Sequence, residues 1–297
     1  MKRVISFGDS FTAGLGTDRV YEESVLGGHP DWDKMNDEQK SKQRRLAAKH
    51  RFNNCFTKFF ADNFGATQIN YGRIGCGNKH ILNEIFQYDI VEGFKKDDFV
   101  LIGFTSSLRD ELPYWPNVVT DNLMAQGGGI TWSLKELVNI ANVHKPVVWE
   151  LKENFKHYDK LDNFMNNYVK DYIVNIHNNE YYDYYNLNLV NIIQKFLEYR
   201  NINYIMFDAF EPMFQNKIPK QINTKYYWEI GKKNIWSYLW DFNDESLYED
   251  DSPSTATIVG KDQLIERNNR IHKHPSRKGH ELFTKELVKF YESIYRI

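Results

Sequence analysis

Short apolar runs separated by long polar stretches dominate the pattern of this 297-residue chain. Each run has the length and the β-branched or aromatic content of a strand. Strands are predicted over Arg3 to Phe7, Thr67 to Tyr71, Asp98 to Gly103 and Tyr204 to Phe207. In the third of these, Val100, Leu101 and Ile102 follow one another directly, which is typical of a parallel strand covered on both faces.

Between the strands, apolar positions recur at helical spacing and predict helices that pack on a sheet. They are expected over Arg51 to Phe64, around Ile81, Ile85, Ile90 and Val91, within 158–178, around Val190 to Tyr199, and at a closing stripe of Phe283, Leu287, Phe290, Tyr291 and Ile294. Strands that alternate with helices predict an α/β fold. We expect a three-layer α/β/α sandwich with a parallel, doubly wound, flavodoxin-like sheet.

Three polar or irregular stretches interrupt this pattern and are expected to be insertions into one domain over 1–297. They lie at about 17–50, 107–155 and 211–262. The first is charged and predicts a loop followed by a solvated helix. In the second, the prolines and the Gly127–Gly129 run predict a long loop over 111–130.

A candidate nucleophile stands directly after the first predicted strand. Gly8 permits a sharp turn, and Ser10 then lies where a helix would begin, at the carboxyl edge of the sheet. Ligands of open α/β sheets bind at that edge, and backbone N–H groups there favour an anion. The same serine would also make a good helix cap, so this stretch alone leaves both roles open.

Two distant segments favour the catalytic role. Gly75 follows the second strand, and His274 stands in a His-Pro-Ser context just before the closing helix. With Gly8-Asp9-Ser10 at the N-terminal end, these segments resemble the SGNH (GDSL-like) hydrolase family in type and in order. The resemblance implies a nucleophile at Ser10, a general base at His274, and an oxyanion site that includes the backbone N–H groups of Ser10 and Gly75. It covers the two ends and the region around 67–110.

The chain departs from the family pattern at two positions that matter for the mechanism. Thr105 stands where the family has an oxyanion-binding Asn, so a side-chain donor there would be a hydroxyl, unless it bonds local backbone instead. Ile271 stands where the family has Asp, three residues before the histidine. Either another carboxylate orients the imidazole, or a Ser-His dyad works with backbone or water. The candidate acids are Asp262, Asp208 and Glu266.

Composition narrows the function classes. The formal net charge is −2, which gives no electrostatic reason to expect a nucleic-acid partner. No run of 18 apolar residues exists, so no membrane partner is expected. The chain has two cysteines, and its N-terminal residues lead straight into a strand, so a cytoplasmic chain or one otherwise lacking a signal peptide is expected.

Motifs for other chemistries are incomplete in this chain. His272, His274 and His280 have no adjoining cysteine or acidic cluster, so no metal is expected. Arg19 stands where a dinucleotide fingerprint needs its third glycine, and no cofactor is expected.

The function that fits these features best is a serine esterase. Its expected substrate is a small acyl ester, such as acetyl on a carbohydrate, because the insertions are polar and rich in aromatic residues. An acyltransferase of the same fold stays open, as does a degenerate member that binds glycans or partners without turnover. The oligomeric state is left open by the sequence.

Overall fold

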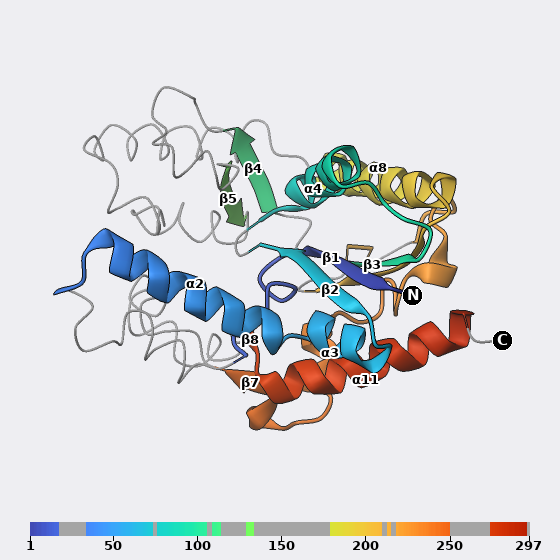
Figure 1. The fold of residues 1–297 in the computed structure, drawn as a ribbon. Helices are drawn as coiled ribbons and strands as arrows, with labels where there is room; N and C mark the ends of the chain where they lie inside the picture. Colours follow the sequence, from blue (N-terminus) through green and yellow to red (C-terminus); the bar gives the residue numbers. More distant parts are fainter. Residues whose placement is uncertain are drawn as a thin grey trace, which may run out of the picture.

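The computed structural model describes residues 1–17, 34–73, 76–105, 109–113, 129–133, 179–209, 213–214, 218–249 and 274–295. The central sheet has four parallel strands: β1 (Arg3–Gly8), β2 (Thr67–Gly72), β3 (Asp98–Phe104) and β6 (Asn203–Asp208). Their order is β2-β1-β3-β6, so the chain winds outward in both directions from β1. The predicted doubly wound α/β architecture is confirmed, and all four carboxyl ends meet at one edge (Figure 1).

Helices cover both faces of this sheet, as Figure 1 shows. On one face lie α4 (Asn78–Val91) and α8 (Asn179–Tyr199), and on the other lie α3 (Phe56–Asn63) and α11 (Arg277–Tyr295). The sheet has one hydrophobic core on each face, and alternate residues of a strand point into one or the other. Ile5 and Ile102 pack toward α4 and α8, whereas Val4 and Leu101 pack toward α3 and α11. Burial on both faces explains why β1, β3 and β6 are nearly continuous apolar runs, whereas the edge strand β2 is only half-buried and alternates apolar with polar residues.

An ion pair fastens the opposite, amino edge of the sheet. Arg3 and Asp98 are register partners on β1 and β3, and the guanidinium donates to both carboxylate oxygens, at 2.7 and 2.6 Å. The Asp98 side chain is only 1% exposed, so the bidentate geometry compensates a largely desolvated charge. The amino ends of β1 and β3 are therefore joined by an ion pair, and the loops of the candidate site lie at the opposite, carboxyl ends.

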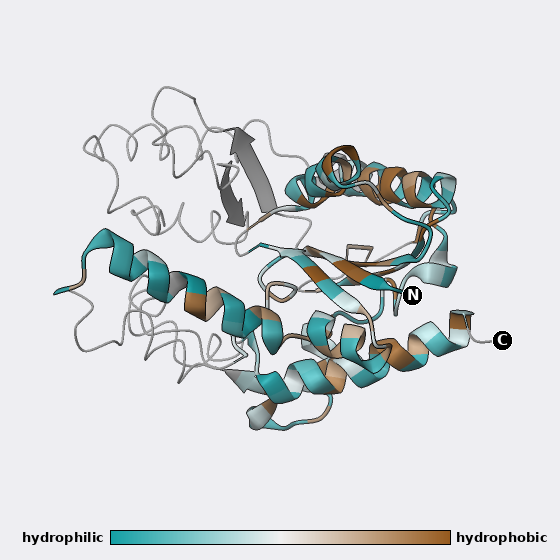
Figure 2. Cartoon of the chain, viewed as in Figure 1, coloured by the Kyte–Doolittle hydropathy of each residue, from teal (hydrophilic) through white to brown (hydrophobic). Residues whose placement is uncertain are grey.

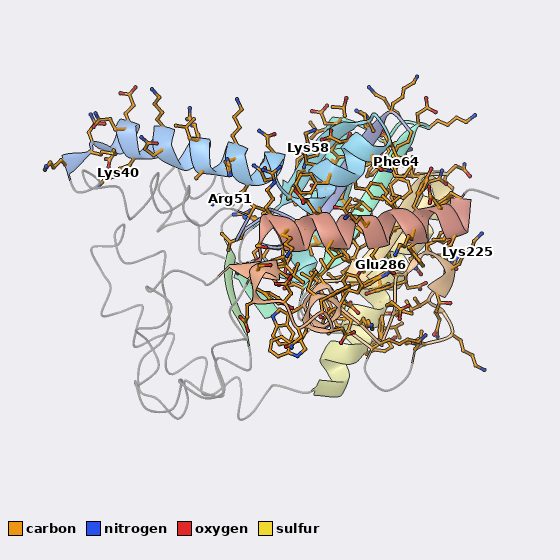
Figure 3. The ribbon with its side chains drawn as sticks, turned by 90° about the horizontal axis from the view of Figure 1, so that it is seen from below. Lys40, Arg51, Lys58, Phe64, Lys225 and Glu286 are labelled. Carbon is orange, nitrogen blue, oxygen red and sulfur yellow. The ribbon has the colours of Figure 1, made fainter. Side chains whose placement is uncertain are left out.

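The first insertion contains the solvated helix that the sequence predicts. Helix α2 (Asp37–Asn53) begins at a capping box of Asn36 and Gln39 and extends away from the sheet. Figure 2 shows α2 as mostly hydrophilic, with a hydrophobic band that interrupts the teal. Figure 3 shows Lys40 near its outer end and Arg51 near the end that meets α3.

The predicted helix over Arg51 to Phe64 is wrong as a single element. It is divided between α2 and α3, because the Asn54 amide donates to the His50 carbonyl and ends α2. Helix α3 then turns Phe56 and Phe60 into the core.

The predicted loop over 111–130 is wrong at both ends. Strands β4 (Arg109–Pro113) and β5 (Gly129–Ser133) form an antiparallel pair there, which suits the β-branched and aromatic residues Ile130, Thr131 and Trp132. The helix expected within 158–178 lies outside the described residues. The assignment of 1–297 to one domain stays a prediction.

The described part of the third insertion, which ends at residue 249, contains several short elements. They are η3 (Thr224–Tyr226), α9 (Ile235–Trp240), η4 (Glu245–Leu247) and β7 (Tyr248–Glu249), and β7 pairs with β8 (His274–Pro275). Within the described part of the chain, no helix has the length and apolar character that crossing a membrane requires.

Candidate active site

Ser10 lies in a tight turn that replaces the expected helix start. The Phe11 N–H donates to the Asp9 carboxylate at 3.0 Å, and the Ala13 N–H donates to the Asp9 carbonyl at 2.9 Å. The chain then forms a series of turns, because Gly14 and Gly16 adopt positive φ values of 80° and 89° that stop a right-handed helix. Ser10 is therefore held by turn hydrogen bonds at the carboxyl end of β1, and its side chain is nearly buried.

His274 meets Ser10 from the other end of the chain. Its Nε2 lies 2.9 Å from the Ser10 Oγ, although the two residues are 264 positions apart. The imidazole packs edge to face against Phe11, with ring centroids 5.1 Å apart. A Cβ at Gly16 would lie 2.6 Å from the His274 Cβ, so only glycine allows the Ser10 turn to approach this histidine so closely. With the proton on Nδ1, Nε2 has the geometry to accept the serine proton.

Thr105 follows β3 at the same edge and is clamped by a side-chain amide. The Thr105 N–H donates to the Asn78 Oδ1 at 2.9 Å, and the Asn78 Nδ2 donates to the Thr105 carbonyl at 3.2 Å. The Thr105 hydroxyl itself is buried and has no hydrogen-bond partner among the described residues. Asn78 therefore satisfies the Thr105 backbone without using the Thr105 hydroxyl.

Asn78 is a site residue that sequence reasoning missed. It is buried at the first position of α4, three residues after Gly75, and it also donates to Asn186 on α8. The only signal in the sequence is a short polar residue directly after Gly77, which looks like ordinary helix capping. Its actual partner belongs to a different strand end, and one sequence does not reveal such long-range pairs.

Asp208, one of the candidate acids, ends β6 and is completely buried. The Tyr227 hydroxyl donates to its Oδ1 at 2.7 Å. Burial raises the pKa of Asp208 to about 7, against the smaller opposing effect of the Tyr227 hydrogen bond. A carboxyl that is only about half ionised at pH 7 is poorly suited to stabilise an imidazolium, and the described contacts do not place it against His274. Its role as the acid stays a prediction.

This raised pKa predicts a pH effect on stability. The folded chain holds the Asp208 proton up to about pH 7, whereas an unfolded Asp releases it near 3.8. The folded state therefore binds one more proton between these values, and this carboxyl's contribution to the unfolding free energy falls as pH rises through that window. Asn does not titrate, so the unfolding free energy of Asp208→Asn lacks this pH dependence. Its difference from the native value should therefore shift in favour of the variant by up to about 4 kcal/mol as pH rises from 4 to 8. Urea unfolding at both pH values measures this, and parallel pH curves for the two chains would contradict it.

His280 is structural, as its place on the closing helix suggests. Its Nδ1 accepts from the Phe56 N–H at 3.3 Å, and its ring stacks on Phe56 with centroids 5.7 Å apart. Burial, with a smaller contribution from neighbouring His274, lowers the pKa of His280 to about 3. It is thus neutral at physiological pH.

The remaining predicted site residues, Gly75, Asp262 and Glu266, lie outside the described residues. Across the described ranges, no group of three or more His, Cys, Asp or Glu side chains is arranged to hold a metal ion. The described part of the candidate site thus contains the contacting pair Ser10 and His274, and Thr105 lies at the end of β3, the strand next to β1.

Comparison with protein-family models gives no match, and no curated protein matches. Among solved structures, 97% of the chain aligns with 97% of a member of the lipolytic protein G-D-S-L family from Veillonella parvula DSM 2008, with 8% identity and a TM-score of 0.38. A G-D-S-L-family lipolytic protein from Desulfitobacterium hafniense DCB-2 aligns over 98% of this chain and 99% of its own, with 11% identity and a TM-score of 0.32. Overlaps of this size carry no argument about activity.

Proposed function

We propose that this chain is a serine ester hydrolase with Ser10 as nucleophile and His274 as general base. The observation that carries the proposal is the 2.9 Å contact between the Ser10 Oγ and the His274 Nε2. A serine hydroxyl is a weak nucleophile until a neutral imidazole accepts its proton. The two groups come from opposite ends of the chain to the edge where open α/β sheets bind ligands, which favours chemistry over helix capping.

The reaction follows from this pair. Ser10 attacks the ester carbonyl while His274 takes the hydroxyl proton, and His274 then returns that proton to the leaving alcohol. Water repeats the attack on the acyl-serine with the same base and regenerates Ser10. The oxyanion that forms in each step is bound by the backbone N–H groups of Ser10 and Gly75 and by the Thr105 hydroxyl.

We expect Thr105→Val to lower kcat by roughly 10- to 100-fold with little change in KM, because it removes a donor used mainly in the transition state. The substitution keeps the shape of the side chain and deletes a buried hydroxyl that has no partner among the described residues, so stability should not fall. Steady-state kinetics with a thermal melt separate the two effects. An unchanged kcat would mean that backbone alone makes the oxyanion site.

The proposed substrate is a small acyl group on a carbohydrate or another polar alcohol. An acyltransferase would use the same acyl-serine and replace water with a sugar hydroxyl. A degenerate binder would keep the fold without turnover. Labelling by a fluorophosphonate probe, together with Ser10-dependent release of acetate from acetyl esters, supports the hydrolase. Release of the alcohol with transfer of the acyl group to an added sugar would identify the transferase, and absence of both labelling and turnover would leave the binder.

A further inference from the structure

Arg73 brings a guanidinium to the sheet edge where Ser10 lies. It directly follows β2, and its N–H donates to the carbonyl of Gly8, two residues before Ser10, at 2.8 Å. The end of β2 also lies against the Ser10 turn (residues 9–16), because a Cβ at Gly72 would be 2.3 Å from the Ala13 nitrogen. Arg73 is thus a direct neighbour of the turn that carries the nucleophile.

The Arg73 side chain is half-buried and reaches the first turn of α4. Its Nη1 lies 3.4 Å from the His80 Nε2, and the same His80 nitrogen lies 3.3 Å from the Glu84 carboxylate. Burial, with a smaller contribution from the Arg73 charge, lowers the pKa of His80 to about 4, so this histidine is neutral at physiological pH. His80 therefore orients the guanidinium without neutralising it.

The guanidinium of Arg73 keeps its charge and most of its hydrogen-bond donors. Among the described residues, no carboxylate comes within ion-pair distance of it, whereas Arg3 at the amino end of β1 is fully paired with Asp98. A guanidinium presents its N–H groups in a planar fork that matches a carboxylate or a phosphate. Solvent and salt screen a partly buried charge less than an exposed one. This position therefore favours an anionic ligand group.

Helix α2 adds basic residues on another side of the Ser10 turn. A Cβ at Gly14 would be 2.7 Å from the Arg51 carbonyl, so the last turn of α2 lies against the Ser10 turn. The acids Asp37 and Glu38 are confined to the first turn of α2, at its outer end, whereas Arg51 is at the inner end (Figure 3). Basic residues thus flank this turn from two elements, in a chain whose formal net charge is −2.

We propose that Arg73 binds a carboxylate or phosphate group of the substrate, so that the ester cleaved by this chain is anionic. This inference rests on the proposed function and narrows its substrate class. The negative group would form a forked, charge-assisted pair with the guanidinium while the ester carbonyl lies at Ser10. Hydrogen bonds to charged groups of this kind change affinity by roughly 10- to 100-fold.

The test compares pairs of esters that have nearly the same shape and differ in charge. Acetoxyacetate and acetoxyacetamide differ in the alcohol part, and monomethyl glutarate and methyl glutaramate differ in the acyl part. In at least one pair, the native chain should have a kcat/KM roughly 10- to 100-fold higher for the charged ester, mainly through KM. This preference should shrink in about 1 M salt. Equal kcat/KM within both pairs would overturn the inference and leave the esterase intact.

Variants of Arg73 show whether this residue is the source of the preference. Arg73→Gln should nearly abolish it, and Arg73→Lys, which keeps the charge without the fork, should retain part of it. Arg200→Gln is the matched control, because Arg200 lies between α8 and β6, toward the amino edge, and pairs with Asp89. It should keep the full preference. A full preference in folded Arg73→Gln, or an equal loss in Arg200→Gln, would overturn the inference. If Arg73→Gln does not fold, an undiminished preference in Arg73→Lys would overturn it.

Binding to Ser10→Ala separates this inference from the proposed function, because that variant lacks the nucleophile. A ligand-observed NMR titration should show tighter binding of the charged ester to Ser10→Ala and no such difference in the double variant Ser10→Ala, Arg73→Gln. Equal binding of the charged and neutral esters to Ser10→Ala would refute the anion site. A native chain that cleaves no ester, combined with charge-selective binding to Ser10→Ala, would refute the hydrolase and support the anion site.

Discussion

Ser10→Ala is expected to abolish ester hydrolysis while leaving the fold intact. The substitution removes only the hydroxyl that faces the His274 Nε2 at 2.9 Å. The turn around it is held by hydrogen bonds to the Asp9 side chain and to main-chain carbonyls, which alanine preserves. The loss in kcat should be about 10⁴-fold or more, as is found when the nucleophile of a serine enzyme is deleted. Fluorophosphonate labelling should disappear with it.

Ser6→Ala provides the matched control for this experiment. Ser6 is a fully buried serine on β1, four residues earlier, and among the described residues its hydroxyl makes a single long 3.5 Å contact, with the Ile69 carbonyl. Its removal should leave kcat and labelling close to native. An active Ser10→Ala variant would refute the nucleophile, and an equally inactive Ser6→Ala variant would point to damage of β1 rather than to chemistry.

Most of the sheet could be predicted from sequence because β1, β3 and β6 are buried on both faces. That environment demands nearly continuous apolar runs, and these runs are each bounded by turn or polar residues, whereas the half-buried edge strand β2 shows only an alternating pattern. The buried positions of the helices were predicted less accurately than the strands. Ile90 and Val91 continue the apolar spacing of α4 but are exposed, whereas Tyr88 is buried in their place. Spacing alone does not tell where the sheet stops covering a helix.

The candidate site was only partly predictable. The motif order placed Ser10 and His274 at one sheet edge, and the structure has them in contact. The elements that hold them depend on pairings between distant segments, such as the Asn78 clamp on Thr105 and the β7–β8 pair. A two-residue strand has no periodicity to detect, so the β7–β8 pair that carries His274 does not stand out in the sequence.

His274→Ala is expected to be as damaging as the loss of Ser10. Without the imidazole, the Ser10 hydroxyl has no base 2.9 Å away, and kcat should fall by about 10⁴-fold or more. Ser10 and His274 act as a unit, so the double variant Ser10→Ala, His274→Ala should be no slower than either single variant.

The kcat of the double variant is the sharpest test of the pair. If the two residues acted independently, the fold-losses of the two single variants would multiply in the double variant. His274→Gln serves as a second variant that keeps a polar side chain beside Gly16 and Phe11 without a base, and it should be equally inactive. The measurement is kcat for these four variants and the native chain, with thermal melts to confirm that each variant is folded. A folded His274→Ala variant with native kcat would show that the contact with Ser10 is structural, and the esterase proposal would fail with it.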